Sequence, residues 1–236
     1  MTDKLRVLSI LLAASSSFLL GCGDIPEEAA VDQIAAPIKG GEHGDFQITS
    51  PAFENGSPLP DVNTCNGKPF GSGVSPVLEW ANAPQHTKSF AIVFKDISLT
   101  EATPPDLRGF HNVIWDLQKN TNSLPAALPS TEFLDDPPVA RQWSRYSPYG
   151  YLGPCPNFNP ALPPRTDTYS FTLYALETKI LDYPPPDPAI PNYTKVMDDF
   201  LAAHAIAKTE LRVTSNAIPS APPVPPGAPP APSPRP

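Results

Sequence analysis

The stretch YSFTLYAL, at residues 169–176, is the clearest β-strand signal in the chain and indicates its fold class. It is dense in aromatic and other β-favouring residues, which are typical of strands. Four shorter apolar or alternating stretches upstream predict further strands at residues 46–49, 77–80, 89–94 and 110–117. Because no helical pattern separates these five stretches, a parallel α/β fold is disfavoured. We therefore predict a mainly β fold, an antiparallel β-sandwich.

One late segment departs from the β pattern. Residues 194–211 place apolar side chains near helical spacing, with Thr194 as a candidate N-cap, and predict a small C-terminal helical element. Residues 212–214 then predict a last strand. The chain has 236 residues, 35 of them proline, which disfavours a helical bundle because an interior proline costs roughly 3 kcal/mol in a helix.

The first 22 residues, MTDKLRVLSILLAASSSFLLGC, have the form of a secretory signal. Two basic residues precede an apolar stretch that is too short and too weakly flanked for a spanning helix. The final Leu-Leu-Gly-Cys resembles a bacterial lipobox, in which the cysteine is lipidated. We expect residues 1–21 to be a lipoprotein signal peptide and Cys22 to anchor the chain in a membrane. An ordinary cleaved signal with an incidental cysteine is the alternative, and Gly23 favours the outer membrane, facing the periplasm.

The mature chain divides into three parts. Residues 22–44 predict a flexible tether, residues 45–217 a single domain, and residues 218–236 a disordered proline-rich tail with polyproline II character. The tail is a candidate ligand for an aromatic groove or a spacer, or else an inert terminus. Cys65 and Cys155 form an even pair in an exported chain and predict a disulfide, with two reduced core cysteines as the alternative.

Charge and motifs exclude several function classes. The chain has 16 Lys and Arg against 24 Asp and Glu, a formal net charge of −8, and has no basic run. Nucleic acid is therefore excluded as a partner, because binding to a phosphate backbone draws on clustered basic residues. Motifs for dinucleotides, a Walker loop, a zinc protease, a serine nucleophile or a CxxC site are absent from the sequence. We expect no cofactor, no metal and no catalytic residues.

The chain has four histidines, and one of them is a candidate for function. His43 falls in the tether, His86 in a polar turn, and His204 on the predicted core-facing side of the helix, where structural roles are expected. His111 lies on a predicted strand, on the same face as Val113 and Trp115. If its strand neighbours the one that ends at Asp96, the carboxylate and the imidazole meet at one rim of the sheet.

A set of strings, in order along the chain, resembles the signature blocks of the phosphatidylethanolamine-binding protein (PEBP) family. That family includes the Raf kinase inhibitor proteins and their bacterial relatives. The strings are SPVLEW (75–80), TKSF (87–90) with Asp96, Phe110-His111, Gly150-Tyr151, GPCP (153–156) and YSFTLYAL (169–176). The resemblance covers roughly residues 45–215. It implies a β-sandwich with a peripheral helix and a small pocket at one end that binds phosphate-like anions and phosphorylated head groups.

Residue by residue, the resemblance assigns this pocket to Asp96, His111, Gly153, Pro154 and Tyr169. His111 would donate to the anion with Asp96 orienting the imidazole from behind. Tyr169 would supply a hydroxyl, and the Gly153–Pro154 turn would form the wall, because glycine permits close approach.

The chain also departs from the family pattern. Asp167 stands where members usually have a second pocket histidine, and a carboxylate there should repel phosphate. It is either turned outward, or the ligand is less anionic. Asn112 replaces a tryptophan usual in bacterial members, and only the first acid of the family's Asp-Pro-Asp-Ala-Pro string is kept, as Asp96.

The leading interpretation is an envelope lipoprotein whose PEBP-like pocket binds a small phosphorylated or anionic ligand, without catalysis. A second hypothesis is an interaction or inhibitor module that acts on an envelope protein partner. A third is a hydrolase that uses an Asp96–His111 dyad, for which no motif places a nucleophile.

Overall fold

The computed structural model describes residues 44–144, 149–179 and 192–220. The predicted signal peptide, Cys22 and nearly all of the tether lie outside the described residues, as do His43 and residues 221–236 of the tail. Within the described ranges, none of the helices has the length and apolar character needed to cross a bilayer.

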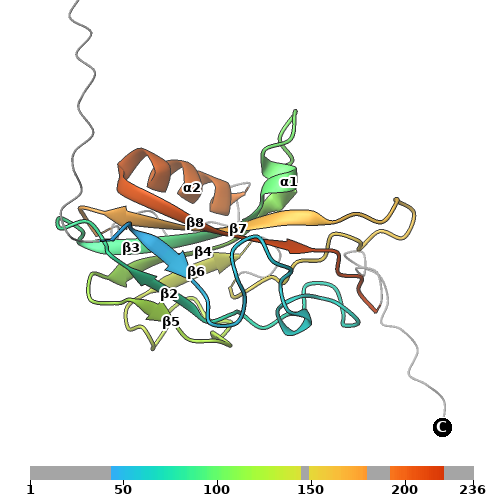
Figure 1. The fold of residues 1–236 in the computed structure, drawn as a ribbon, viewed down its shortest axis with the longest axis horizontal. Helices are drawn as coiled ribbons and strands as arrows, with labels where there is room; N and C mark the ends of the chain where they lie inside the picture. The colour runs from blue at the N-terminus through green and yellow to red at the C-terminus, as the bar shows by residue number, and fades with distance from the viewer. Residues whose placement is uncertain (1–43, 145–148, 180–191, 221–236) are drawn as a thin grey trace, which may run out of the picture. The chain divides into compact units, whose positions relative to one another are not determined.

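The strands form two antiparallel sheets (Figure 1). The larger sheet has the spatial order β6 (Arg141–Ser144), β4 (Phe110–Gln118), β3 (Ser89–Asp96), β7 (Asp167–Leu176) and β8 (Ala205–Ser215). The smaller sheet has the order β1 (Gln47–Thr49), β2 (Leu78–Ala81) and β5 (Ser123–Leu124). The described residues also form helices α1 (Ile97–Thr100) and α2 (Tyr193–His204), with short 3-10 helices at Asp61–Asn63 and Leu107–Gly109. The predicted mainly β, antiparallel fold is confirmed.

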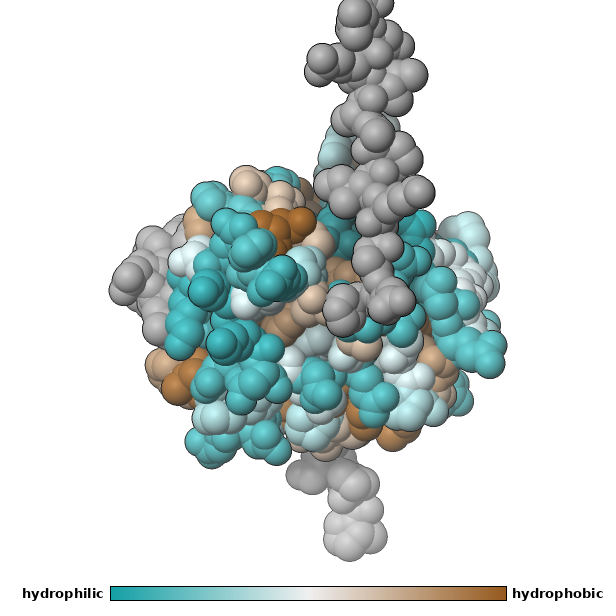
Figure 2. All heavy atoms as spheres, turned by 60° about the vertical axis from the view of Figure 1, so that its left-hand side comes forward, coloured by the Kyte–Doolittle hydropathy of each residue, from teal (hydrophilic) through white to brown (hydrophobic). Residues whose placement is uncertain are grey.

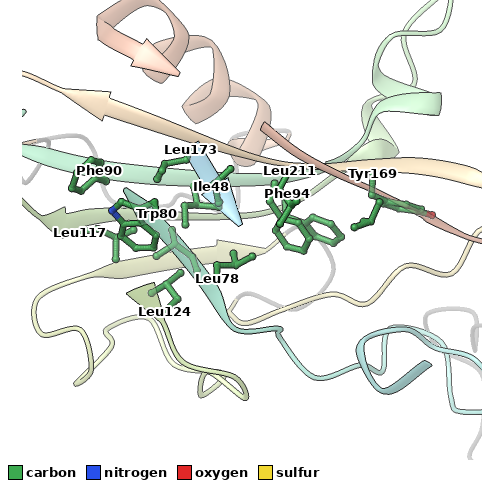
Figure 3. Close-up of a cluster of buried hydrophobic side chains, with 14 of the residues drawn as sticks. Ile48, Leu78, Trp80, Phe90, Phe94, Leu117, Leu124, Tyr169, Leu173 and Leu211 are labelled. Atoms are coloured by element: carbon green, nitrogen blue, oxygen red, sulfur yellow. The ribbon is translucent and has the colours of Figure 1, made fainter. Parts of the chain in front are cut away.

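Two apolar clusters cover opposite faces of the larger sheet. Alternate residues of β3 belong to different clusters, Ile92 to one and Val93 to the other, because successive strand side chains point to opposite faces. The first cluster includes Leu78 and Trp80 of the smaller sheet and lies between the two sheets (Figure 3). The second includes Met197 of α2, which covers the other face. The molecule is therefore a sandwich with a helix added outside one sheet.

The predicted strands are present, but the helix was predicted to continue to residue 211 and ends at His204. Met197 and Leu201 keep the expected helical spacing and are buried in α2. At Ala205 the backbone becomes extended, with φ −74° and ψ 135°, and β8 pairs along β7. This pairing satisfies backbone groups of β7 that would otherwise form an open sheet edge. The N-cap is Asn192 rather than Thr194.

The predicted disulfide between Cys65 and Cys155 is present, with their Cα atoms 5.4 Å apart. Both cysteines are buried, in a small cluster with Ala217 that is separate from the two main clusters. The chain stays attached nearby, because the carbonyl of Ile218 accepts a hydrogen bond from the Gly67 amide at 2.9 Å. The first residues of the predicted tail therefore lie against the loop that follows Cys65.

Candidate functional site

The antiparallel register of β3 and β7 brings two of the predicted site residues together. Asp96, the last residue of β3, lies directly opposite Tyr169 of β7. Asp167 lies two residues before Tyr169 on the same face, because side chains alternate along a strand. Tyr169 lies at the end of the larger sheet drawn on the right in Figure 3. Figure 2 brings the other end forward, and its visible surface is largely hydrophilic, with small separate apolar patches.

Asp96 is a buried carboxyl with an unusual protonation equilibrium. Its side chain is 2% exposed and caps α1 by accepting a hydrogen bond from the Leu99 amide at 3.2 Å. The pKa of Asp96 is raised to about 7, mainly by burial and then by the charge and hydrogen bonding of Asp167, against the lowering effect of bonds from Tyr169 and Leu99. Asp96 therefore changes its charge near neutral pH.

His111 is directed into the site by an irregularity in β4. Asn112 pairs with Phe94, but the next β3 residue, Lys95, pairs with Phe110, so His111 occupies a bulge. Its ring packs edge to face on Phe94 at 5.3 Å and on Tyr169 at 5.6 Å. The prediction that His111 shares a face with Val113 and Trp115 is therefore wrong. A bulge turns the side chain, and regular alternation cannot anticipate it.

A backbone carbonyl, rather than Asp96, orients the imidazole at Nδ1. This ring nitrogen lies 3.1 Å from the carbonyl oxygen of Leu152. Because a carbonyl can only accept, Nδ1 carries the hydrogen. The other ring nitrogen, Nε2, accepts a hydrogen bond when the ring is neutral and donates one when the ring is protonated.

The Gly153–Pro154 turn forms a closely packed wall beside His111. A Cβ atom added to Gly153 would lie 2.2 Å from the carbonyl oxygen of Ser72, so no larger residue fits without moving the backbone. The carbonyl of Pro154 accepts a hydrogen bond from the Cys65 amide at 3.1 Å. The wall is therefore attached to the loop that carries Cys65, and it follows directly on Leu152, the partner of His111.

Tyr169 keeps its proton in this setting. The residue is 1% exposed, and burial raises its pKa well above 10, with the negative charges of Asp96 and Asp167 as further causes. Its hydroxyl therefore stays a hydrogen-bond donor across the physiological range. That donor is directed to Asp96.

Asp167 is turned inward, which answers a question that the sequence leaves open. It is 4% exposed and lies 2.9 Å from the Nε atom of Arg165, measured at Oδ2. The guanidinium of Arg165 is partly exposed and offsets the negative charge of Asp167 at the site. The sequence offers one signal for this pair, the two-residue spacing of opposite charges, but our sequence analysis missed it.

Two more residues, to which the sequence assigned no role, support the site. Tyr151 stacks on Phe94 at 5.2 Å, and its hydroxyl donates to the carbonyl of Asn63 at 3.0 Å. Asn112, one of the departures from the family pattern noted above, donates from its amide to the carbonyl of Gly150 at 3.1 Å. Both contacts hold the segment that contains Leu152, Gly153 and Pro154, so the departure at Asn112 serves the wall.

The other described histidines lie away from this site. His86 is exposed. His204 is also exposed and stacks on Phe200 at 4.2 Å, so the prediction that it faces the core is wrong. The helix ends at His204, and its ring bonds the Phe200 carbonyl of the last turn at 2.7 Å instead of entering the core. Within the described ranges, no three side chains from His, Cys, Asp and Glu are arranged to hold a metal ion.

The sequence matches the family model described as phosphatidylethanolamine-binding protein over residues 49–216. The chain belongs to this family. The match lies within the predicted domain, residues 45–217, and includes every residue of the site described above. The fold predicted from the resemblance and the family membership are thus both confirmed for this PEBP domain.

Relatives and solved structures agree with this assignment. A UPF0098 protein of Aquifex aeolicus is 29% identical over 143 residues, covering 59% of this chain and 73% of that protein. One from Archaeoglobus fulgidus is 30% identical over 129 residues, covering 54% of this chain and 39% of that protein, so the chain spans less than half of its length. The crystal structure of YbcL from Escherichia coli, described as a member of the mammalian PEBP family, has a TM-score of 0.55 at 23% identity and covers 73% of this chain and 99% of YbcL. The crystal structure of CT736 from Chlamydia trachomatis, described as a PEBP homologue, has a TM-score of 0.51 at 24% identity. The match covers 72% of this chain and 96% of CT736. These two likenesses show the fold.

Proposed function

We propose that this PEBP domain binds a small phosphorylated or anionic ligand at the His111 end of the larger sheet. The observation that carries the proposal is the packing of His111 on Tyr169, with ring centroids 5.6 Å apart, next to the closely packed Gly153. These residues belong to the set through which the family resemblance predicts anion binding. Assignment to the bacterial Raf kinase inhibitor-like branch stays a prediction from the same strings.

The chemistry at His111 favours a phosphate group that can lose or keep a proton. With Nδ1 donating to the Leu152 carbonyl, a protonated ring donates from Nε2 to a phosphate oxygen, and a neutral ring accepts from a P–OH group. The two acids of the site reduce their repulsion of such a ligand in different ways. Asp96 is neutral below its pKa of about 7, and Asp167 is paired with Arg165.

The same geometry favours binding without turnover. In a hydrolytic Ser-His-Asp arrangement, a carboxylate accepts from Nδ1 and stabilises the imidazolium that forms. In this protein a neutral backbone carbonyl takes that place at Nδ1. We therefore expect no hydrolysis of a panel of carboxylic esters and phosphodiesters, and measurable turnover that depends on His111 would overturn this part of the proposal.

Calorimetric titration of the full-length protein with phosphoethanolamine and with inorganic phosphate tests the proposal. We expect saturable binding that is lost in His111→Ala. The matched control is His204→Ala, which removes an exposed imidazole bonded within its own helix and should bind as the wild type does. No binding by the wild type at millimolar concentration would count against the proposal, as would equal affinities for wild type and His111→Ala.

We also propose that the domain is presented at the cell envelope as a lipoprotein anchored through Cys22. The support is the lipobox-like Leu-Leu-Gly-Cys that ends the apolar signal at residue 22. Labelling of bacterial cells that express the chain with a tagged fatty acid should mark the wild type and leave Cys22→Ser unmarked. A labelled Cys22→Ser variant would show that the anchor is elsewhere.

A further inference from the structure

The wall of the site is an irregular segment that depends on distant parts of the chain. Residues 150–155 belong to no strand. Their backbone carbonyls instead accept hydrogen bonds from side chains and from a loop. The carbonyl of Leu152 takes the hydrogen of His111 Nδ1 at 3.1 Å, and the carbonyl of Pro154 accepts from the Cys65 amide at 3.1 Å. The disulfide from Cys155 to Cys65 then closes the segment, three residues beyond Leu152.

The disulfide lies outside the cores that hold the sandwich together. Its small cluster contains Ala217 and is separate from the cluster between the sheets and from the cluster under α2. The elements that it joins are the loop after Asp61–Asn63, the wall segment and the chain at Ala217, whose carbonyl accepts from the Asn157 amide at 3.3 Å. Strand pairing in the larger sheet runs from β6 to β8 without involving either cysteine.

We propose that the Cys65–Cys155 disulfide is a positioning element of the ligand site, so that its reduction abolishes ligand binding while the sandwich stays folded. The proposal rests on the proposed function, because it concerns the same site. Without the covalent link, the wall segment keeps its hydrogen bonds, the stacking of Tyr151 on Phe94 and the close approach of Gly153 to Ser72, all of them non-covalent. The Leu152 carbonyl then gains freedom to move, and with it the orientation of the imidazole.

The chemical step is a two-electron thiol–disulfide exchange with a dithiol. One thiolate of the dithiol attacks a sulfur of the bridge, the S–S bond breaks, and a mixed disulfide forms. The second thiolate of the dithiol closes its own disulfide and releases the second cysteine. The protein ends with two thiols, whose protons come from the dithiol, which is itself oxidised to a cyclic disulfide. Affinity for the ligand would in this way follow the redox state around the protein.

Titration with phosphoethanolamine before and after reduction by dithiothreitol tests the proposal on the full-length protein. Mass spectrometry establishes that both thiols are free, and hydrogen exchange is followed in the same samples. We expect the affinity to fall at least tenfold and to return on reoxidation. Exchange should accelerate at residues 61–74 and 150–158, with β3 and β7 unchanged.

The double variant Cys65→Ala/Cys155→Ala should reproduce the reduced protein. Its matched control is Leu201→Ala, which removes buried volume under α2, keeps the disulfide, and should bind phosphoethanolamine as the wild type does. Equal affinity in oxidised and reduced wild type overturns this inference alone. Accelerated exchange throughout the sheets on reduction also overturns it, because the role is then global stability. Absence of binding by the oxidised wild type overturns the proposed function together with it.

Discussion

Replacing Asp96 by asparagine changes how the stability of this protein depends on pH. The buried carboxyl of Asp96 has a pKa of about 7, mainly because burial disfavours its charged form. Asparagine has nearly the same shape and keeps an oxygen that can accept from the Leu99 amide. Its NH₂ group can donate toward Asp167 as the protonated carboxyl does. Asp96→Asn therefore imitates the neutral form of the residue at every pH.

The size of the effect follows from the difference between the folded and unfolded states. The pKa of Asp96 rises from 3.8 to about 7 on folding, and at about 1.36 kcal/mol for each pKa unit this amounts to about 4 kcal/mol. Between these values the folded state holds a proton that the unfolded state releases, so stability falls as pH rises. The loss begins near the unfolded pKa and is complete above the folded pKa. From pH 5 to pH 8 it amounts to about 3 kcal/mol.

Urea unfolding of wild type and Asp96→Asn at pH 5 and pH 8 measures this contribution. We expect the variant to gain about 3 kcal/mol relative to the wild type over this interval. Asp199→Asn, which changes an exposed carboxyl on α2, should follow the wild type at both pH values. A difference between wild type and Asp96→Asn that does not change with pH would show that Asp96 does not titrate near neutrality. The assignment of a neutral carboxyl to the site would then be wrong.

Three further substitutions test other contacts. Gly153→Ala places a Cβ 2.2 Å from a backbone oxygen and should lower the free energy of unfolding in urea by about 2–3 kcal/mol. The control Gly67→Ala has open space but a φ of +65° and should lower it by about 1 kcal/mol. Equal losses of stability would contradict the close packing of the wall. Asp198→Ala leaves the half-buried Lys95 ammonium and the buried Tyr174 hydroxyl without their shared partner and should lower the free energy of unfolding by about 3 kcal/mol. Asp199→Ala, in an exposed pair with Lys195, should change it by less than about 0.5 kcal/mol. Asp167→Asn removes a negative charge from the site and should strengthen phosphate binding roughly tenfold, about 1.4 kcal/mol; weaker binding in titration calorimetry would mean that the carboxylate assists the ligand.

The strands could be predicted where the pattern is long and apolar. YSFTLYAL and the buried stretch before Asp96 became β7 and β3, whose side chains are buried on both faces by the smaller sheet and α2. β6 carries only RQWS and β5 only two residues, too little for a period to be visible. The junction at His204 was missed because helical spacing continues by chance into residues that pair with β7. Pairing of that kind is a tertiary effect.

The site could be predicted in its membership but not in its orientation. Resemblance supplied Asp96, His111 and Tyr169; the strand register pairs Asp96 with Tyr169, and the ring of His111 packs on Tyr169. The Leu152 carbonyl at Nδ1 was not anticipated, because a bulge at His111 turns the ring toward Phe94 and the wall segment presents this carbonyl to it. Neither a bulge nor an irregular backbone has a sequence period, so both depend on contacts that only the folded chain makes.

The charge of the site illustrates the same division. The sequence shows an acid at position 167 and leaves its direction open, since either face of the strand start could be outward. Folding buries Asp167 beside Asp96, and ionising two neighbouring buried carboxylates at once costs free energy because their charges repel. One is paired with Arg165, and the other has its pKa raised to about 7. A site that keeps two acids in this way can still accept an anion below neutral pH, and it should discriminate against anions above it.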